Sequence, residues 1–182
     1  LRWMLLQEVR HEPHSIFVEF SIYTSLAFIF SYLESLIPLP LPFPGMKLGL
    51  ANLVILIVLY QKNTGYALGL SMLRNLLNAF TFGSLFSLLY STAGSLLSLS
   101  VMVLTLRLSK KRLSILSVSA LGGISHNLGQ LLSASFFVGF RSILWYAPVL
   151  YFSGLFTGIL IGWVAGQVVQ RIKADTLSRI MI

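Results

Sequence analysis

The sequence has no cysteine and very little charge, and each shortage excludes a class of protein. Without cysteine there are no disulfides, iron–sulfur clusters or thiolate zinc sites. Charged residues make up 10% of the chain, whereas soluble domains carry about 25%. Hydrophobic residues make up 56%. Such a chain cannot cover a water-facing surface of normal polarity, so we expect membrane lipid to surround most of its exterior.

The motifs of the common enzyme classes are also missing. The sequence contains no Walker glycine loop and no nucleophile elbow. Its single aspartate, Asp175, excludes aspartate-rich pairs for magnesium diphosphate. Ser125 and His126 are adjacent, so on a helix they point about 100° apart and cannot form a dyad. We therefore expect no catalytic residue, no cofactor and no metal site.

Apolar runs fill nearly the whole length of the chain. A membrane-spanning helix needs about 20 apolar residues, and six such helices with short loops account for most of the sequence. We predict an all-α integral membrane protein, with one domain of six transmembrane helices over residues 16–170. A segment 1–15 precedes this domain and a tail 171–182 follows it. The expected spans are about 16–37, 46–60, 66–90, 95–108, 115–140 and 143–169.

Two loops between these runs have distinct chemistry. Residues 38–45 carry a proline at every second position. Proline has no N–H to donate and restrains the residue before it to extended backbone, so this segment is a non-helical strap. Such backbone is tolerated near a membrane where it packs on protein or lines a cavity. The second span is short unless the strap dips into the interface. Residues 91–94 are predicted as an uncharged turn between the third and fourth spans.

The basic residues predict the orientation. The net charge is +8, but lysine and arginine lie in short clusters between apolar runs, which argues against nucleic acid binding. An even number of spans places four of these clusters on one side, which identifies that side as cytoplasmic. We predict a multi-pass protein of the cell membrane with both termini in the cytoplasm. The residues on that side are Arg2, Arg10, Lys62, Arg107, Lys110, Lys111, Arg112, Arg171, Lys173 and Arg179.

Small residues recur at four-residue spacing in two of the runs. This spacing puts them on one helix face, where another backbone can approach closely. In the last run the glycines are Gly154, Gly158, Gly162 and Gly166. Packing inside the bundle is the favoured interpretation there, and a seam that docks on a partner is the alternative. In the first run, packing and docking are equally open for Ala27, Ser31 and Ser35.

One arginine lies in the interior of an apolar run. An ionisable group at the bilayer centre costs at least about 2.5–3.5 kcal/mol, so it usually faces a cavity or a partner. Arg74 has Asn78 one helical turn further along on the same face. Glu34 is the acidic residue nearest the outer half of the protein. Two interpretations stay open: Arg74 pairs with Glu34 or with backbone carbonyls, or it binds an anionic ligand.

Polar residues also cluster in the fifth run and just after the strap. His126 and Gln130 share a helix face, with Asn127 beside them and glycines nearby. This group forms either hydrogen bonds between helices or part of a binding site. Lys47 and Asn52 follow the strap. Lys47 either extends to the outer surface or meets an anionic group beneath the strap.

Three segments together resemble a known family. They are residues 44–52 (PGMKLGLAN), 73–77 (LRNLL) and 125–131 (SHNLGQL). In order and spacing they resemble the Gx transporter family, also labelled heptaprenyl diphosphate synthase component I. The strap departs from that pattern by an extra Pro-Leu repeat. The family is in turn similar to the substrate-binding S components of energy-coupling factor (ECF) transporters.

The resemblance implies a fold and a function. It implies a compact six-helix bundle, an outward-open cavity under a proline-rich lid loop, and uptake of a small vitamin- or cofactor-like molecule. It also implies docking through Ala27, Ser31 and Ser35 onto a transmembrane coupling subunit that carries cytoplasmic ATPases. The expected cavity residues are Glu34, Lys47, Asn52, Arg74, Asn78, His126, Asn127 and Gln130. The alternatives are a non-catalytic subunit of a prenyl- or quinone-handling or redox complex, and a purely structural assembly subunit.

Overall fold

The computed structural model describes residues 13–36, 49–110, 112–139 and 145–180. The predicted strap and the segment 1–12 lie outside these residues. All regular structure in the described part is helical, which confirms the all-α class. The helices are α2 (Pro13–Leu36), α3 (Leu50–Gln61), α4 (Thr64–Thr81), α5 (Leu85–Leu108), α6 (Ile115–Val138) and α8 (Ala147–Ile180).

Three of the described helices are long and apolar enough to cross a membrane. The stretches are Ile16–Leu36 in α2, Leu85–Leu108 in α5 and Ala147–Ile172 in α8. The bundle's exterior is apolar, since Phe17, Phe80 and Phe136 are 71%, 83% and 89% exposed. The other three helices are shorter or interrupted by polar residues, and α3, with 12 residues, rises only about 18 Å.

The predicted turn at residues 91–94 is wrong. The chain turns at 82–84, and Ser91–Gly94 lie inside α5. The turn forms earlier because Ser84 and Ser87 make a capping box that starts α5. Gly94 serves close packing instead of a turn, because a Cβ added there would meet the His126 carbonyl oxygen at 2.8 Å. The fourth span is therefore longer than predicted.

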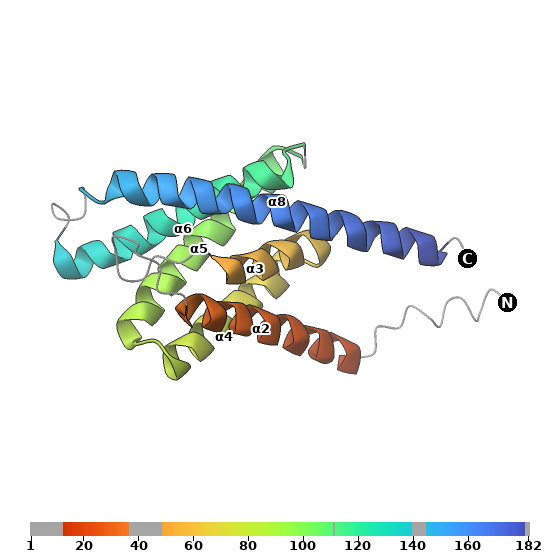
Figure 1. Cartoon of the computed structure of the whole chain (residues 1–182), viewed down its shortest axis with the longest axis horizontal. Helices are drawn as coiled ribbons and strands as arrows, with labels where there is room; N and C mark the ends of the chain where they lie inside the picture. Colours follow the sequence, from red (N-terminus) through yellow and green to blue (C-terminus); the bar gives the residue numbers. More distant parts are fainter. Residues whose placement is uncertain (1–12, 37–48, 111, 140–144, 181–182) are drawn as a thin grey trace.

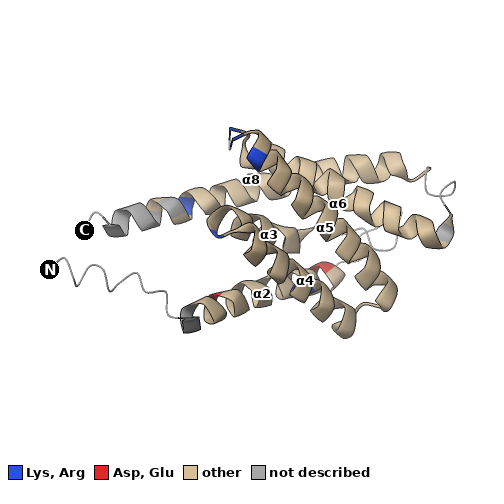
Figure 2. Ribbon diagram, turned by 180° about the vertical axis from the view of Figure 1, so that it is seen from behind, with Lys and Arg blue, Asp and Glu red and all other residues tan. Residues whose placement is uncertain are grey.

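The last helix also differs in length from its prediction. It begins at Ala147 and continues through the predicted tail as far as Ile180. The start of α2 and the end of α8 lie at the same end of the bundle (Figure 1). The exposed basic residues of the described part gather toward that end (Figure 2), namely Lys62, Arg107, Lys110, Arg112 and Arg171.

The helices pack as two groups that meet where α3 contacts α8 and where α4 contacts α5. In one group α6 lies between α5 and α8, and in the other α2, α3 and α4 contact one another (Figure 1). The short α3 packs on α2, α4 and α8. Its apolar residues are therefore almost all buried, with Leu56 and Val58 at most 1% exposed. The core continues into both groups through Leu70 and Val118.

Glycines bring α6 and α8 into backbone contact. A Cβ added to Gly123 would lie 2.2 Å from the carbonyl oxygen of Gly154, and one added to Gly158 would lie 2.7 Å from that of Ser119. At Gly162 a Cβ would meet the Cα of Leu116 at 2.8 Å. Only residues without a side chain allow helices to approach so closely. The predicted glycine face of the last run therefore lies against α6.

Candidate functional site

A cavity of about 370 Å³ lies inside the bundle, and all six described helices line it. This volume is within the range of about 300–1,000 Å³ found for small-molecule sites. Seven of the eight residues predicted to bind a substrate line it; Lys47 lies outside the described residues. The seven are Glu34, Asn52, Arg74, Asn78, His126, Asn127 and Gln130.

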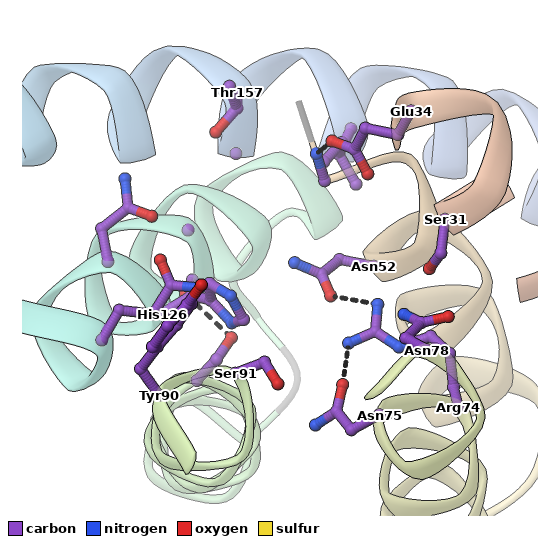
Figure 3. A pocket seen from close by; sticks show the side chains of 18 of the residues that line it. Ser31, Glu34, Asn52, Arg74, Asn75, Asn78, Tyr90, Ser91, His126 and Thr157 are labelled. Atoms are coloured by element: carbon purple, nitrogen blue, oxygen red, sulfur yellow. Dashed lines mark hydrogen bonds between the residues drawn. The ribbon is translucent and has the colours of Figure 1, made fainter. Parts of the chain in front are cut away.

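Arg74 is the buried cation of this cavity, with 6% of its surface exposed. Its Nη1 donates to Asn52 Oδ1 over 3.3 Å, and its Nη2 donates to Asn75 Oδ1 over 2.8 Å and to Ser95 Oγ over 3.4 Å (Figure 3). Asn75 Nδ2 donates to the same serine over 3.1 Å. Arg74 therefore ties α4 to α3 and α5 through neutral acceptors.

The local sequence of α4 determines where these side chains lie. Asn63 caps the helix by accepting a hydrogen bond from the Tyr66 amide at 2.8 Å. From this start, Arg74 and Asn78 follow one another on one face, directed to the cavity (Figure 3). Arg74 Nε and Asn78 Oδ1 are both buried and have no hydrogen-bond partner among the described residues. This pair leaves a donor and an acceptor unsatisfied beside the cavity.

Glu34 joins the end of α2 to the start of α3. Its carboxylate accepts a hydrogen bond from the amide of Gly49, and its side chain is buried. Gly49 has φ +79°, a left-handed conformation that favours glycine. An added Cβ there would also lie 3.0 Å from Ile161 Cδ1 of α8. Glu34 is not among the hydrogen-bond partners of Arg74, so the expected orienting role of Glu34 stays a prediction.

The opposite wall of the cavity comes from α5, α6 and α8. Asn127 Nδ2 donates to the Leu150 carbonyl of α8 over 2.8 Å, which orients its side chain. His126 and Gln130 approach α5 at Gly94, where an added Cβ would meet both side chains within 3.2 Å. A glycine in α5 is therefore what allows these two polar side chains of α6 to pack against that helix beside the cavity.

One polar face of α5 is not among the features predicted from the sequence. Tyr90, Ser91 and Ser98 line the cavity, together with Thr157 of α8, and Ser95 bonds to Arg74. The predicted turn at 91–94 divided this helix in two, so its serines did not fall on one predicted face. The signal was present in the sequence, because serines at 84, 87, 91, 95 and 98 follow the three- and four-residue spacing of one helix face.

The residues predicted to dock on a coupling subunit lie in different environments. Ala27 is completely buried in the core, and Ser31 is 2% exposed and lines the cavity. Ser35 lines the cavity as well but is exposed. Two of the three side chains therefore pack within this chain, and their docking role stays a prediction.

The chemistry available among the described residues of the cavity is recognition by hydrogen bonds and by the Arg74 cation. Among the described residues no three His, Asp or Glu side chains are grouped so that they could hold a metal ion. In the described part of the chain, the polar lining consists mainly of amides and hydroxyls, and its titratable members are Arg74, Glu34, His126 and Tyr90. Such a lining suits a small polar molecule.

Comparison with known proteins gives one result. A family profile described as heptaprenyl diphosphate synthase component I matches residues 23–168. No curated protein and no solved structure matches the chain. The match covers most of the sequence and overlaps every helix that lines the cavity, so it confirms the family resemblance drawn from the three segments. The chain belongs to the heptaprenyl diphosphate synthase component I family.

Proposed function

We propose that this protein is a membrane-embedded substrate-binding subunit, similar to an ECF S component, for uptake of a small vitamin- or cofactor-like molecule. The observation that carries the proposal is the polar cavity of about 370 Å³ within an otherwise apolar bundle. Polar groups inside such a bundle cost free energy unless they are paired. The many polar groups beside this one cavity therefore indicate a function, and ligand recognition is the simplest function that they could serve.

The energy for uptake would come from partner subunits. The chain has no nucleotide-binding motif, and with five acidic residues it has no array of carboxylates for ion coupling. A binding subunit that docks on a transmembrane coupling subunit with cytoplasmic ATPases needs neither. This explains how a small chain without an energy source could serve transport.

The same proposal includes six spans with both termini in the cytoplasm. The exposed basic residues near one end of the bundle support this orientation, because such residues favour the cytoplasmic side (Figure 2). Arg74 and Glu34 lie away from that end, so the cavity would open toward the outside. Since α3 rises only about 18 Å and the hydrocarbon core is about 30 Å thick, a second crossing would need more chain than α3.

Mass spectrometry of small molecules that co-purify with the chain tests the binding function. We expect a bound molecule in the wild-type protein and its loss in Arg74→Ala and His126→Ala. A protein of normal folding that retains the same molecule with the same affinity in both variants would refute the site. Co-purification with ATPase subunits from native membranes tests the uptake role, and absence of any ATPase would argue against it.

The family description favours a second candidate, a non-catalytic membrane subunit that helps a prenyl-handling enzyme bind its lipid substrate. This function predicts co-purification with a soluble synthase and a cavity that opens sideways to the bilayer. Stimulation of such a synthase by the purified chain in vesicles would support it. The amides and hydroxyls that line the cavity favour the uptake function.

A further inference from the structure

We infer that the molecule bound in this cavity carries a single negative charge on a carboxylate, held by Arg74, and a neutral hydrogen-bonding group at its other end. This inference rests on the proposed binding function and narrows its substrate class. It follows from the partners of Arg74, from the balance of charge around the cavity, and from the absence of Lys, Arg, Asp and Glu among the described residues of the side opposite Arg74.

Among the described residues, neither a hydrogen bond nor an ion pair within 4 Å joins Arg74 to a carboxylate, although Glu34 lies close enough to act on it electrostatically. The described acceptors of Arg74 are two amide oxygens and one hydroxyl, and the contacts to Asn52 and Ser95, at 3.3 and 3.4 Å, are long for hydrogen bonds. A hydrogen bond between two charged groups is shorter and roughly twice as strong as a neutral one. An anion entering the cavity would therefore displace these two weak contacts. The bond to Asn75, at 2.8 Å, would keep the guanidinium in position.

The charge of the lining limits the charge of the ligand. Among the described residues that line the cavity, Arg74 is the one Lys or Arg and Glu34 the one Asp or Glu. These two charges balance, so each negative charge on a ligand adds an uncompensated charge to the described lining. A phosphate monoester or a diphosphate would bring further negative charge into an apolar bundle, close to the carboxylate of Glu34, at a high desolvation cost. A carboxylate brings one charge and matches the planar guanidinium.

Among the described residues, the far side of the cavity carries no Lys, Arg, Asp or Glu, and His126 is its titratable side chain apart from Tyr90. Tyr90 lies across the cavity from Arg74 (Figure 3), and Asn127 and Gln130 of α6 also line the cavity. Asn127 uses its Nδ2 on the Leu150 carbonyl, which leaves its Oδ1 to accept from a ligand. Gln130 makes no side-chain hydrogen bond to another described residue, so its amide can both donate and accept. A hydroxyl or amide on the ligand would satisfy these groups.

Four matched probes test the inference on the full chain in lipid nanodiscs at pH 8. They are 4-hydroxybenzoate, its neutral analogue 4-hydroxybenzamide, the dianionic 4-hydroxyphenyl phosphate, and benzoate, which lacks the distal hydroxyl. Binding is measured by saturation-transfer NMR. We expect 4-hydroxybenzoate to bind about tenfold more tightly than the amide, since a hydrogen bond to a charged group contributes about 1.5–3 kcal/mol. It should also bind more tightly than the phosphate and benzoate.

Two variants test whether Arg74 is responsible for the preference for a carboxylate. Arg74→Gln should lower the affinity for 4-hydroxybenzoate about tenfold and leave that for the amide nearly unchanged. Lys62→Gln removes a positive charge that does not line the cavity and should change neither affinity. The comparison of probes on the wild-type chain decides the question even if Arg74→Gln fails to fold.

Several outcomes would overturn the inference. They are equal binding of the amide and the carboxylate, tighter binding of the phosphate, and no binding of any probe. Failure of the proposed function would look different. A co-purified molecule without a carboxylate would refute this inference and leave the binding function intact, whereas a chain with neither a bound molecule nor an ATPase partner would refute the binding function itself.

Discussion

The two helix groups of this protein are held together by different means. In the group of α5, α6 and α8, glycines bring backbones together, as at Gly123 and Gly154. In the group of α2, α3 and α4, large side chains such as Leu56, Leu70 and Tyr66 fill the space between helices. The first group can adjust little to an added side chain, because contacts between backbone atoms cannot be relieved by rotating a side chain. The second can repack, and it also holds the charged side of the cavity.

The largest expected effect comes from adding a side chain to the glycine-packed group. Gly123→Ala places a Cβ 2.2 Å from the Gly154 carbonyl oxygen, so α6 and α8 must separate. We expect a loss of about 3 kcal/mol in unfolding free energy, the upper end for overpacking, measured by denaturation in detergent micelles. Gly65→Ala is the matched control, since its Cβ would lie 3.4 Å from the nearest atom, Asn63 Oδ1. Equal loss in both variants would contradict the comparison.

Removing a side chain from the other group should cost somewhat less. Leu70 is completely buried in α4, and Leu70→Ala removes its packing contacts. We expect the unfolding free energy to fall by about 2 kcal/mol, the lower end for such truncations. The loss is small because lipid, and not water, is the alternative environment of the side chain. The same unfolding assay checks this value. Leu76→Ala, on the exposed face of α4, should cost little; a larger loss there than at Leu70 would refute the packing argument.

The polar contacts that join the two groups should contribute less to the unfolding free energy than the buried leucine. Asn75 is 1% exposed and connects Arg74 to Ser95. Asn75→Ala should cost about 1.5 kcal/mol, because it leaves the charged guanidinium without its shortest hydrogen bond. Ser95→Ala should cost less, since its contact to Arg74 is 3.4 Å long. A double-mutant cycle in the unfolding assay measures the coupling, and strictly additive losses would show that the three residues do not act as a network.

The smallest expected effect is at the end of the bundle away from the cavity. Lys62 and Glu19 form an ion pair at 2.6 Å that is partly exposed. Glu19→Gln should lower the unfolding free energy by less than about 1 kcal/mol, as is usual for such pairs. Its effect should also shrink in high salt. A loss greater than that of Asn75→Ala would mean that this pair, and not the network around Arg74, joins the helices.

The candidate site could be predicted to the extent that it consists of polar residues in apolar runs. Arg74, Asn78, His126 and Gln130 stand out because each is costly in lipid unless it has a use. Asn75 and Ser95 do not stand out in this way, since asparagine beside arginine and serine in a helix are both common. Their role became visible only when α4 and α5 were placed side by side.

Residue order alone predicts that this chain is helical and apolar outside, and it shows which polar residues need an explanation. These are local properties, set by hydropathy along each run and by side-chain chemistry. Three features became visible only in the folded chain: the turn at 82–84, the packing contact of Gly94, and the cavity that residues of all six described helices share. These features depend on which helix faces meet. That depends on packing between segments far apart in the chain, which the periodicity of any single segment does not reveal.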